Sequence, residues 1–188
     1  PQAITGLMVQ IFLQGGAAIN AICETHQLDL TVVDAGVVSP SPDRTQLIQA
    51  RIAAGTADYR EQPAMTRQQV QQCLDKGAEI IRALIARTGT NCIAFGEMGI
   101  GNSSSAALLL SSLTGRAIED CVGAGAGADP QQLAQKKATL RQVIDLHQPT
   151  TDPIQALSCF GGFEIAMMAG AMLEAARQEA CIVVDGFI

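Results

Sequence analysis

The sequence predicts a protein of the α/β class, with a parallel sheet between layers of helices. Short apolar runs rich in β-branched residues alternate with longer segments whose apolar residues recur at helical spacing. Several of the short runs end in glycine or aspartate, which is typical of strand ends in such sheets. The composition is 48% hydrophobic but only 3% aromatic, with 18 glycines and no tryptophan, which suits close-packed helices. Together these observations predict a Rossmann-like parallel sheet with helices on both faces.

In the amino-terminal half, periodicity and cap residues mark the helices. Residues 4–24 carry apolar side chains at helical spacing, and Gly15-Gly16 interrupts them where a kink or close packing is expected. Thr66 is a suitable cap for a helix over residues 67–87, whose apolar positions follow the helical period. Two strands separated by a loop are expected between these helices, the strands at residues 30–33 and 48–52 and the loop at 39–43.

The carboxy-terminal half continues the alternation. A buried strand at residues 91–94 precedes a helix that ends near Gly115. Residues 120–127 are interpreted as a second glycine-rich strand end, and Asp129-Pro130 then opens a helix that runs to about Leu146. The remaining segments are a linker, a helix and a last strand, expected at residues 147–151, 165–176 and 181–184.

Charge and hydropathy narrow the possible partners. The net charge is −6 and the pI about 4.8, and no basic stripe is present, which argues against nucleic acid. We expect no uninterrupted apolar stretch long enough to cross a bilayer, and no cationic leader precedes an apolar run. The sequence therefore predicts a soluble, cytoplasmic protein with neither a membrane nor a nucleic-acid partner.

The cysteines indicate free thiols. None of the six forms a C-x-x-C pair, and three of them, Cys92, Cys121 and Cys181, fall in predicted buried strands. Buried thiols in a reducing compartment are therefore expected, rather than disulfides or zinc. No cluster of ligands indicates a metal.

The strongest functional signal is the stretch from Phe95 to Ser105. Its glycines follow an apolar strand and precede a helix, so the backbone can approach a ligand closely and the helix start can favour a phosphate. Asn102 and Ser103 are good cap residues and offer further donors. Glu97 would repel a phosphate, so proton handling or recognition of a neutral or cationic group explains it better.

A simpler interpretation competes with this one. Glycine-rich turns between a strand and a helix also serve only to close tight connections in α/β proteins. The stretch matches neither a Walker loop nor the G-x-G-x-x-G fingerprint. The residues alone leave a functional site and a plain connection equally open.

A second glycine-rich loop, residues 123–127, precedes the helix that carries Lys136 and Lys137. A lysine in the first turns of that helix can fold back towards an anion at the loop. A solvated lysine pair on an exposed face is the alternative, and the residues alone favour it. Three methionines are expected in the core rather than at a ligand: Met167, Met168 and Met172.

Residues 96–104, Gly-Glu-Met-Gly-Ile-Gly-Asn-Ser-Ser, closely resemble a motif of one enzyme family. Further motifs of the same family lie along nearly the whole chain, at residues 15–20, 32–36, 55–57, 63–65, 161–165, 168–173 and 183–187. The family is the nicotinate-nucleotide:5,6-dimethylbenzimidazole phosphoribosyltransferases of cobalamin nucleotide-loop assembly. Several long motifs in the same order make the resemblance specific.

The resemblance implies transfer of the ribosyl phosphate of nicotinate mononucleotide to a lower-ligand base such as 5,6-dimethylbenzimidazole. The products would be nicotinate and α-ribazole 5′-phosphate, with inversion at the anomeric carbon. No cofactor and no metal are implied. The implied partners are these small molecules and a second copy of the chain in a homodimer.

The resemblance also assigns site residues. Glu97 matches an active-site glutamate and Lys136 a phosphate-contacting lysine, which reverses the interpretation of Lys136 as part of a solvated pair. The matching nucleotide-loop positions are Gly99, Asn102, Ser103, Gly123 and Gly125. Met98 and Met8 fall at positions that resemble the base pocket, where apolar surface would stack on an aromatic ring.

The sequence departs from the family pattern at its ends. The principal catalytic base of the family is a glutamate near the carboxyl terminus, beyond Ile188, and the amino-terminal helices of a small domain would precede Pro1. Ser103 and Ser104 replace frequent threonines, which keeps the hydroxyl groups. We therefore expect residues 1–188 to be a truncated large α/β nucleotide-binding domain that turns over poorly alone.

Two other functions stay open. One is a binding or regulatory module that keeps the nucleotide fold without catalysis. The other is a different sugar-phosphate or nucleotide enzyme that uses the same kind of loop.

Overall fold

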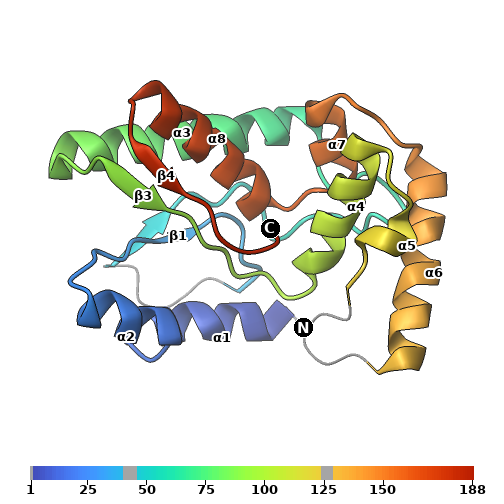
Figure 1. The fold of residues 1–188 in the computed structure, drawn as a ribbon, viewed down its shortest axis with the longest axis horizontal. Coiled ribbons are helices and arrows are strands. Elements are labelled where there is room, and N and C mark those ends of the chain that lie inside the picture. The colour runs from blue at the N-terminus through green and yellow to red at the C-terminus, as the bar shows by residue number, and fades with distance from the viewer. Residues whose placement is uncertain (1, 40–45, 124–128) are drawn as a thin grey trace.

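A computed structural model describes residues 2–39, 46–123 and 129–188 (Figure 1). Its elements in chain order are α1 (Gln2–Leu13), α2 (Ala18–Thr25), β1 (Val32–Asp34), β2 (Leu47–Gln49), α3 (Arg67–Thr88), β3 (Cys92–Ala94), α4 (Asn102–Thr114), α5 (Ile118–Cys121), α6 (Pro130–His147), α7 (Pro153–Phe160), α8 (Phe163–Arg177) and β4 (Cys181–Val183). The long helices and the short strands predicted from the sequence are confirmed, apart from the strand end expected at residues 120–127. Most of the predicted loop at residues 39–43 lies outside the described residues.

The strands of the described residues pair in parallel, β1 with β2 and β3 with β4. Val32 is opposite Leu47 in the first pair, and Cys92 is opposite Cys181 in the second. Helices lie on both sides of the strands, α3 and α8 on one side and α1 and α2 on the other (Figure 1). The predicted α/β class is confirmed, with the strands arranged as two two-stranded sheets.

The amino-terminal helical segment divides where the sequence predicts. Gly15 has a φ of 76°, and the chain leaves α1 at Leu13 and enters α2 at Ala18. By length and composition alone, Ala3–Thr25 could cross a membrane, which corrects the expectation that no stretch is long enough. The break leaves helices of 12 and 8 residues, each shorter than the roughly 20 residues a bilayer span needs.

α3 begins and ends at signals that the sequence carries. Gln69 N donates to Thr66 Oγ1 at 3.1 Å, and Thr66 N donates to the Gln69 side chain at 2.9 Å, which makes a capping box. Gly89 follows the helix with a φ of 70°, the left-handed conformation in which helices often end. The predicted cap at Thr66 is confirmed.

α3 and α8 cross at two glycines, so their backbones approach without side chains between them. A Cβ atom on Gly77 would lie 2.0 Å from the carbonyl oxygen of Met167. A Cβ atom on Gly170 would lie 2.1 Å from the carbonyl oxygen of Leu74. The crossing therefore fixes where α8 lies, and with it the side chains that α8 carries.

An ion cluster joins the same two helices farther along. The Glu174 side chain is 5% exposed, and its carboxylate accepts hydrogen bonds from Arg177 at 2.7 and 2.9 Å, from Gln178 at 3.0 Å and from Arg82 at 3.2 Å. The hydrogen bonds from Arg177, then those from Gln178 and Arg82, hold the pKa of Glu174 far below its ordinary range. The charged form of Glu174 therefore stabilises the fold.

We expect Glu174→Gln to lower the melting temperature most at neutral pH, and by progressively less as the pH falls below about 4. Because the folded-state pKa is depressed, the carboxylate contributes its full stability above its unfolded pKa of about 4.3, and this contribution is lost as the pH falls from that value through the much lower folded-state pKa. Thermal denaturation between about pH 7 and about pH 2 checks this expectation. Glu79→Gln, which removes an exposed carboxylate paired with Lys76, is the control. An equal loss at both ends of the pH range would contradict the account.

Two short helices differ from the sequence-based prediction. Residues Ile118–Cys121 form α5, so the strand expected to end at residues 120–127 is wrong where the structure describes it. A helix of four residues is too short to show periodicity. α7 follows Asp152, whose carboxylate accepts a hydrogen bond from Ile154 N at 3.0 Å. Asp152-Pro153 therefore marks the start of α7 and not only a linker.

The cysteines are free, but two of them are not buried. Cys121 is buried, although in a helix, whereas Cys92 and Cys181 are exposed and the expectation of burial is wrong for both. Side chains alternate along a strand, and in β3 and β4 it is Ile93 and Ile182 that pack into the cluster with α3 and α8. The two cysteines face the other side of the strand pair.

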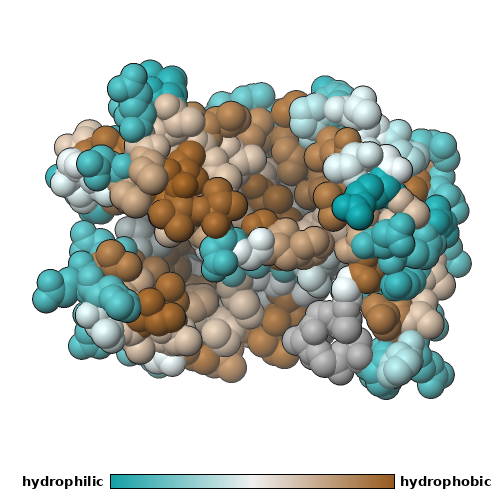
Figure 2. Space-filling model, in the orientation of Figure 1, coloured by the Kyte–Doolittle hydropathy of each residue, from teal (hydrophilic) through white to brown (hydrophobic). Residues whose placement is uncertain are grey.

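Exposed apolar side chains gather over α1 and α2, and over β4 with the residues that follow it (Figure 2). The first set is Ile4, Leu7, Ile19 and Ile22, and the second is Val183, Val184 and Phe187.

Candidate active site

The connection between β3 and α4 forms the predicted glycine-rich turn. Gly101 precedes α4 with a φ of 95°, and Asn102 N donates to the carbonyl oxygen of Gly99 at 3.1 Å. Among the described residues no side chain caps α4, so the expectation that Asn102 and Ser103 cap it is wrong; both lie in its first turn. The amino end of α4 therefore keeps its partial positive charge for an anion.

Lys136 reaches this helix end from α6. Its Nζ lies 3.2 Å from Ser103 Oγ, and no carboxylate in the described part of the chain forms an ion pair with it. Lys137 instead lies near Glu119, whose pKa is lowered mainly by Arg141 and more weakly by Lys137. The solvated pair that the residues alone favour is therefore not observed for Lys136. Its charge lies where the α4 dipole already favours an anion.

The side chain of Asn102 bridges two carboxylates. Its Nδ2 donates to Glu97 Oε2 and lies 3.2 Å from Oε1 of Glu164, the second residue of α8. Burial, and less strongly the charge of Glu97, raises the pKa of Glu164. Sequence reasoning did not single out Glu164, and the available signal was an acid directly after Gly161-Gly162-Phe163 at a helix start.

A cavity of about 430 Å³ lies beside Glu97 and Ser103. Its other walls are Phe95, Gly96, Met168, Met172 and residues 183–188. Met167 is buried in the core as expected, but Met168 and Met172 are not: they are one turn apart on α8, on the side that faces the cavity. The cavity thus combines a carboxylate, a hydroxyl beside a lysine, and apolar surface.

The predicted glycines differ in their relation to this cavity. Gly99 packs against Asn102, because a Cβ atom on Gly99 would lie 2.8 Å from Asn102 Nδ2. Gly123 is exposed just after α5. Gly125 lies outside the described residues.

The two methionines predicted for a base pocket are near the loop but do not line the cavity. Met98 is partly buried next to Glu97 in the chain. Met8 lies on α1, one turn beyond Thr5, whose Oγ1 accepts a hydrogen bond from Ile100 N at 3.4 Å. Their role in binding a base stays a prediction.

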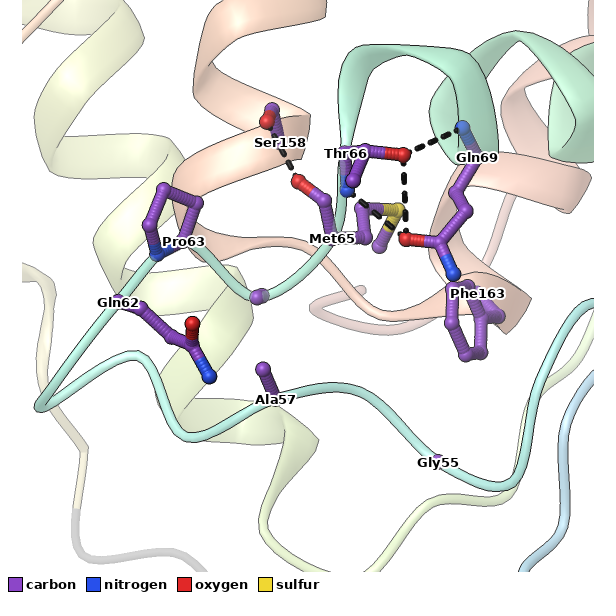
Figure 3. A pocket seen from close by; sticks show the side chains of 10 residues that line it. Gly55, Ala57, Gln62, Pro63, Met65, Thr66, Gln69, Ser158 and Phe163 are labelled. Carbon is purple, nitrogen blue, oxygen red and sulfur yellow. Dashed lines mark hydrogen bonds between the residues drawn. The ribbon is translucent and has the colours of Figure 1, made fainter.

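A second cavity in the described part of the chain contains no titratable group. A cavity of about 320 Å³ lies between the loop that contains Gln62 and the start of α8 (Figure 3). Two of its polar side chains are already paired, since Ser158 Oγ donates to the carbonyl oxygen of Met65 at 2.6 Å and Thr66 Oγ1 accepts from Gln69 N at 3.1 Å. None of its lining residues is titratable. In the described ranges, no three His, Cys, Asp or Glu residues gather as a metal site.

The whole chain, residues 1–188, matches the sequence model of a family described as phosphoribosyltransferase. The chain belongs to this phosphoribosyltransferase family. One relative in the family is nicotinate-nucleotide–dimethylbenzimidazole phosphoribosyltransferase from Variovorax paradoxus, 49% identical over 188 residues. The enzyme of the same name from Cupriavidus necator is 47% identical over 189 residues. All of this chain aligns, and it covers 53% and 54% of those two proteins.

Solved structures of phosphoribosyltransferase relatives share the fold. CobT from Thermus thermophilus matches with a TM-score of 0.92 at 36% identity, over 100% of this chain and 56% of that one. A nicotinate-nucleotide-dimethylbenzimidazole phosphoribosyltransferase from the same organism matches with a TM-score of 0.88 at 34% identity. The chain thus spans about half the length of the relatives it matches. The family resemblance that the motifs indicated is confirmed.

Proposed function

We propose that the protein containing these residues transfers the ribosyl phosphate of nicotinate mononucleotide to 5,6-dimethylbenzimidazole or a related lower-ligand base. The products are nicotinate and α-ribazole 5′-phosphate, for cobalamin nucleotide-loop assembly. The names of the relatives support this activity. The observation that carries it is that Glu97 and Ser103 line one cavity while Lys136 Nζ lies 3.2 Å from Ser103 Oγ.

The phosphate half of the site is the amino end of α4 together with Lys136. A phosphate against Ser103 would accept hydrogen bonds from the hydroxyl and the ammonium group, and the helix dipole would favour its charge. No described carboxylate pairs with Lys136, so the ligand would receive its full charge. Anchoring the phosphate holds the ribose in one place relative to Glu97.

At the ribose, the bond from the anomeric carbon to the nicotinate ring nitrogen breaks, and its electron pair leaves with nicotinate. One nitrogen of the benzimidazole forms the new bond from the opposite face, and the proton on its other nitrogen passes to a base. Glu97 stabilises the positive charge that develops on the ribose. The family resemblance implies that the base is a glutamate outside residues 1–188, so that step is assigned to no residue of this chain.

The acceptor base requires apolar surface beside the sugar. Met168 and Met172 supply it in the cavity that contains Glu97, together with Phe95. Thioether side chains adapt their shape and make favourable contacts with aromatic rings. These residues therefore support a planar aromatic acceptor.

We expect Lys136→Ala to weaken binding of nicotinate mononucleotide to the full-length gene product by about 10-fold to 100-fold, because one charge-assisted hydrogen bond contributes about 1.5–3 kcal/mol. Isothermal titration calorimetry measures the change. Lys137→Ala is the matched control, since Lys137 is the next residue of α6 and lies near Glu119. Equal affinities in the wild type and Lys136→Ala would contradict the proposed phosphate site.

The same titration, combined with an assay for product, distinguishes the two alternative functions. Saturable binding of nicotinate mononucleotide without turnover would favour a binding or regulatory module. Preference for an unrelated nucleotide would favour another sugar-phosphate or nucleotide enzyme.

We also propose that the enzyme is a cytoplasmic homodimer in which residues 1–188 form the large nucleotide-binding domain. The small-residue face of α8 is not available for a dimer contact, because Gly170 packs against α3. The apolar side chains exposed on α1 and α2 support the proposal instead (Figure 2). Sedimentation velocity of the full-length gene product measures its mass in solution.

A further inference from the structure

We propose that Glu164 is a positioning residue that sets the orientation of Glu97 through the side chain of Asn102. The inference rests on the proposed phosphoribosyl transfer and deepens it. Asn102 Nδ2 donates to Glu97 Oε2 and lies 3.2 Å from Glu164 Oε1. A side-chain amide nitrogen carries two hydrogens, so one amide can serve both carboxylates.

Two glycines allow this close arrangement. A Cβ atom on Gly162 would lie 2.4 Å from Glu164 Oε1 and 2.6 Å from Oε2, so the carboxylate folds back over the backbone just before its own helix. A Cβ atom on Gly99 would lie 2.8 Å from Asn102 Nδ2 and 3.2 Å from Glu164 Oε1. A side chain at either position would displace the amide or the carboxylate. Both glycines therefore shape the space that brings Asn102 and Glu164 together.

Glu164 is the fixed end of this chain of contacts. It lies in the first turn of α8, between the buried residues Phe163 and Ala166, and the glycine crossing holds α8 against α3. Glu97 lies in the connection before α4 and lines the cavity. The position of α8 therefore determines where the Glu97 carboxylate lies, because the Asn102 side chain contacts both Glu164 and Glu97.

Among the side chains that surround the Glu164 carboxylate, Asn102 forms the hydrogen bond with it. Glu97 faces it from the connection before α4 and Asn102 from α4 itself. Cys73 faces it from α3, and burial, with a smaller effect from the charge of Glu164, raises the pKa of that thiol to about 12. Within the described residues no lysine or arginine forms an ion pair with Glu164.

In the full-length gene product, Glu164→Ala should lower kcat by about 10-fold to 100-fold, because small misplacements of catalytic groups have effects of this size. KM for nicotinate mononucleotide should change by less than about 3-fold, since the phosphate contacts remain. Glu164→Gln keeps an oxygen acceptor for Asn102 and should recover most of the loss. Glu119→Ala removes a carboxylate from the second position of α5, away from the cavity, and is the matched control.

A double-mutant cycle tests the route through Asn102. If Glu164 acts through that amide, Glu164→Ala should lower kcat little further in an Asn102→Ala background. Independent losses that multiply would overturn the proposal, as would a Glu164→Ala variant with a lower melting temperature but normal kcat. The second result would assign Glu164 a purely structural role.

A crystal structure of the Glu164→Ala full-length protein gives a readout that does not depend on the reaction. We expect the Asn102 side chain to turn away from Glu97 while α4 stays in place. An unchanged contact between Asn102 and Glu97 would overturn the proposal.

If Glu164→Ala does not fold, Gly162→Ala displaces the carboxylate while every polar group remains. A wild-type protein without turnover would refute the proposed function, and the position of Asn102 would still decide this inference.

Discussion

Replacing either glycine at the α3–α8 crossing with alanine should destabilise the protein by about 3 kcal/mol, at the upper end of the usual cost of overpacking. A Cβ atom would lie 2.0 Å from the Met167 carbonyl oxygen for Gly77, and 2.1 Å from that of Leu74 for Gly170. Both clashes are with backbone, so no change of rotamer relieves them and the helices must move apart. Alanine improves helix propensity by only about 1 kcal/mol, which does not compensate.

Denaturant unfolding of Gly77→Ala and Gly170→Ala checks this expectation. Gln72→Ala, at an exposed position of α3, is the control and should change stability by less than about 0.5 kcal/mol. The double variant should lose less than the sum of the single losses, since helices separated by one methyl group already have room for the other. Single variants as stable as the wild type would show that the helices do not cross this closely.

Glu97→Gln should reduce kcat of the full-length gene product by about 100-fold to 1,000-fold, the usual cost of removing a group that stabilises charge in the transition state. The glutamine is nearly the same size and can still accept a hydrogen bond, so the cavity keeps its shape. Affinity for nicotinate mononucleotide should be kept or slightly increased, because a carboxylate near a phosphate repels it.

Steady-state kinetics and calorimetry on the same preparations separate these two effects. Glu79→Gln, which changes an exposed glutamate of α3, should leave both kcat and affinity unchanged. A Glu97→Gln variant with normal kcat would remove Glu97 from the reaction. A variant that lost affinity and kept kcat would make Glu97 a binding residue only.

Most of the fold could be predicted from the sequence, because its signals are local. Thr66 with Gln69 marks the start of α3, and Asp129-Pro130 marks the start of α6, where Asp129 accepts a hydrogen bond from Gln132 N at 2.8 Å. α5 was missed because one turn shows no period. Cys92 and Cys181 were expected to be buried because an apolar run does not tell which side of a short strand faces the core.

The site was predicted only in part, because its geometry depends on contacts between distant segments. The residues alone favour a solvated Lys136, and only the resemblance implies that it contacts a phosphate. Its contact with Ser103, 33 positions away in the chain, is a finding of the structure. Glu164 and Met168 reach the site because the glycine crossing places α8, and no local pattern carries that information. The expected caps of α4 are wrong because Gly101 occupies the cap position and Asn102 and Ser103 lie in the first turn, where the Asn102 side chain binds carboxylates.

The proposed phosphoribosyl transfer can be measured by incubating the full-length gene product with nicotinate mononucleotide and 5,6-dimethylbenzimidazole. Mass spectrometry identifies the products, and NMR gives the configuration at the anomeric carbon. We expect nicotinate and α-ribazole 5′-phosphate in equal amounts, with the configuration inverted. Release of nicotinate without the ribazole product, or a product with retained configuration, would refute the proposed transfer.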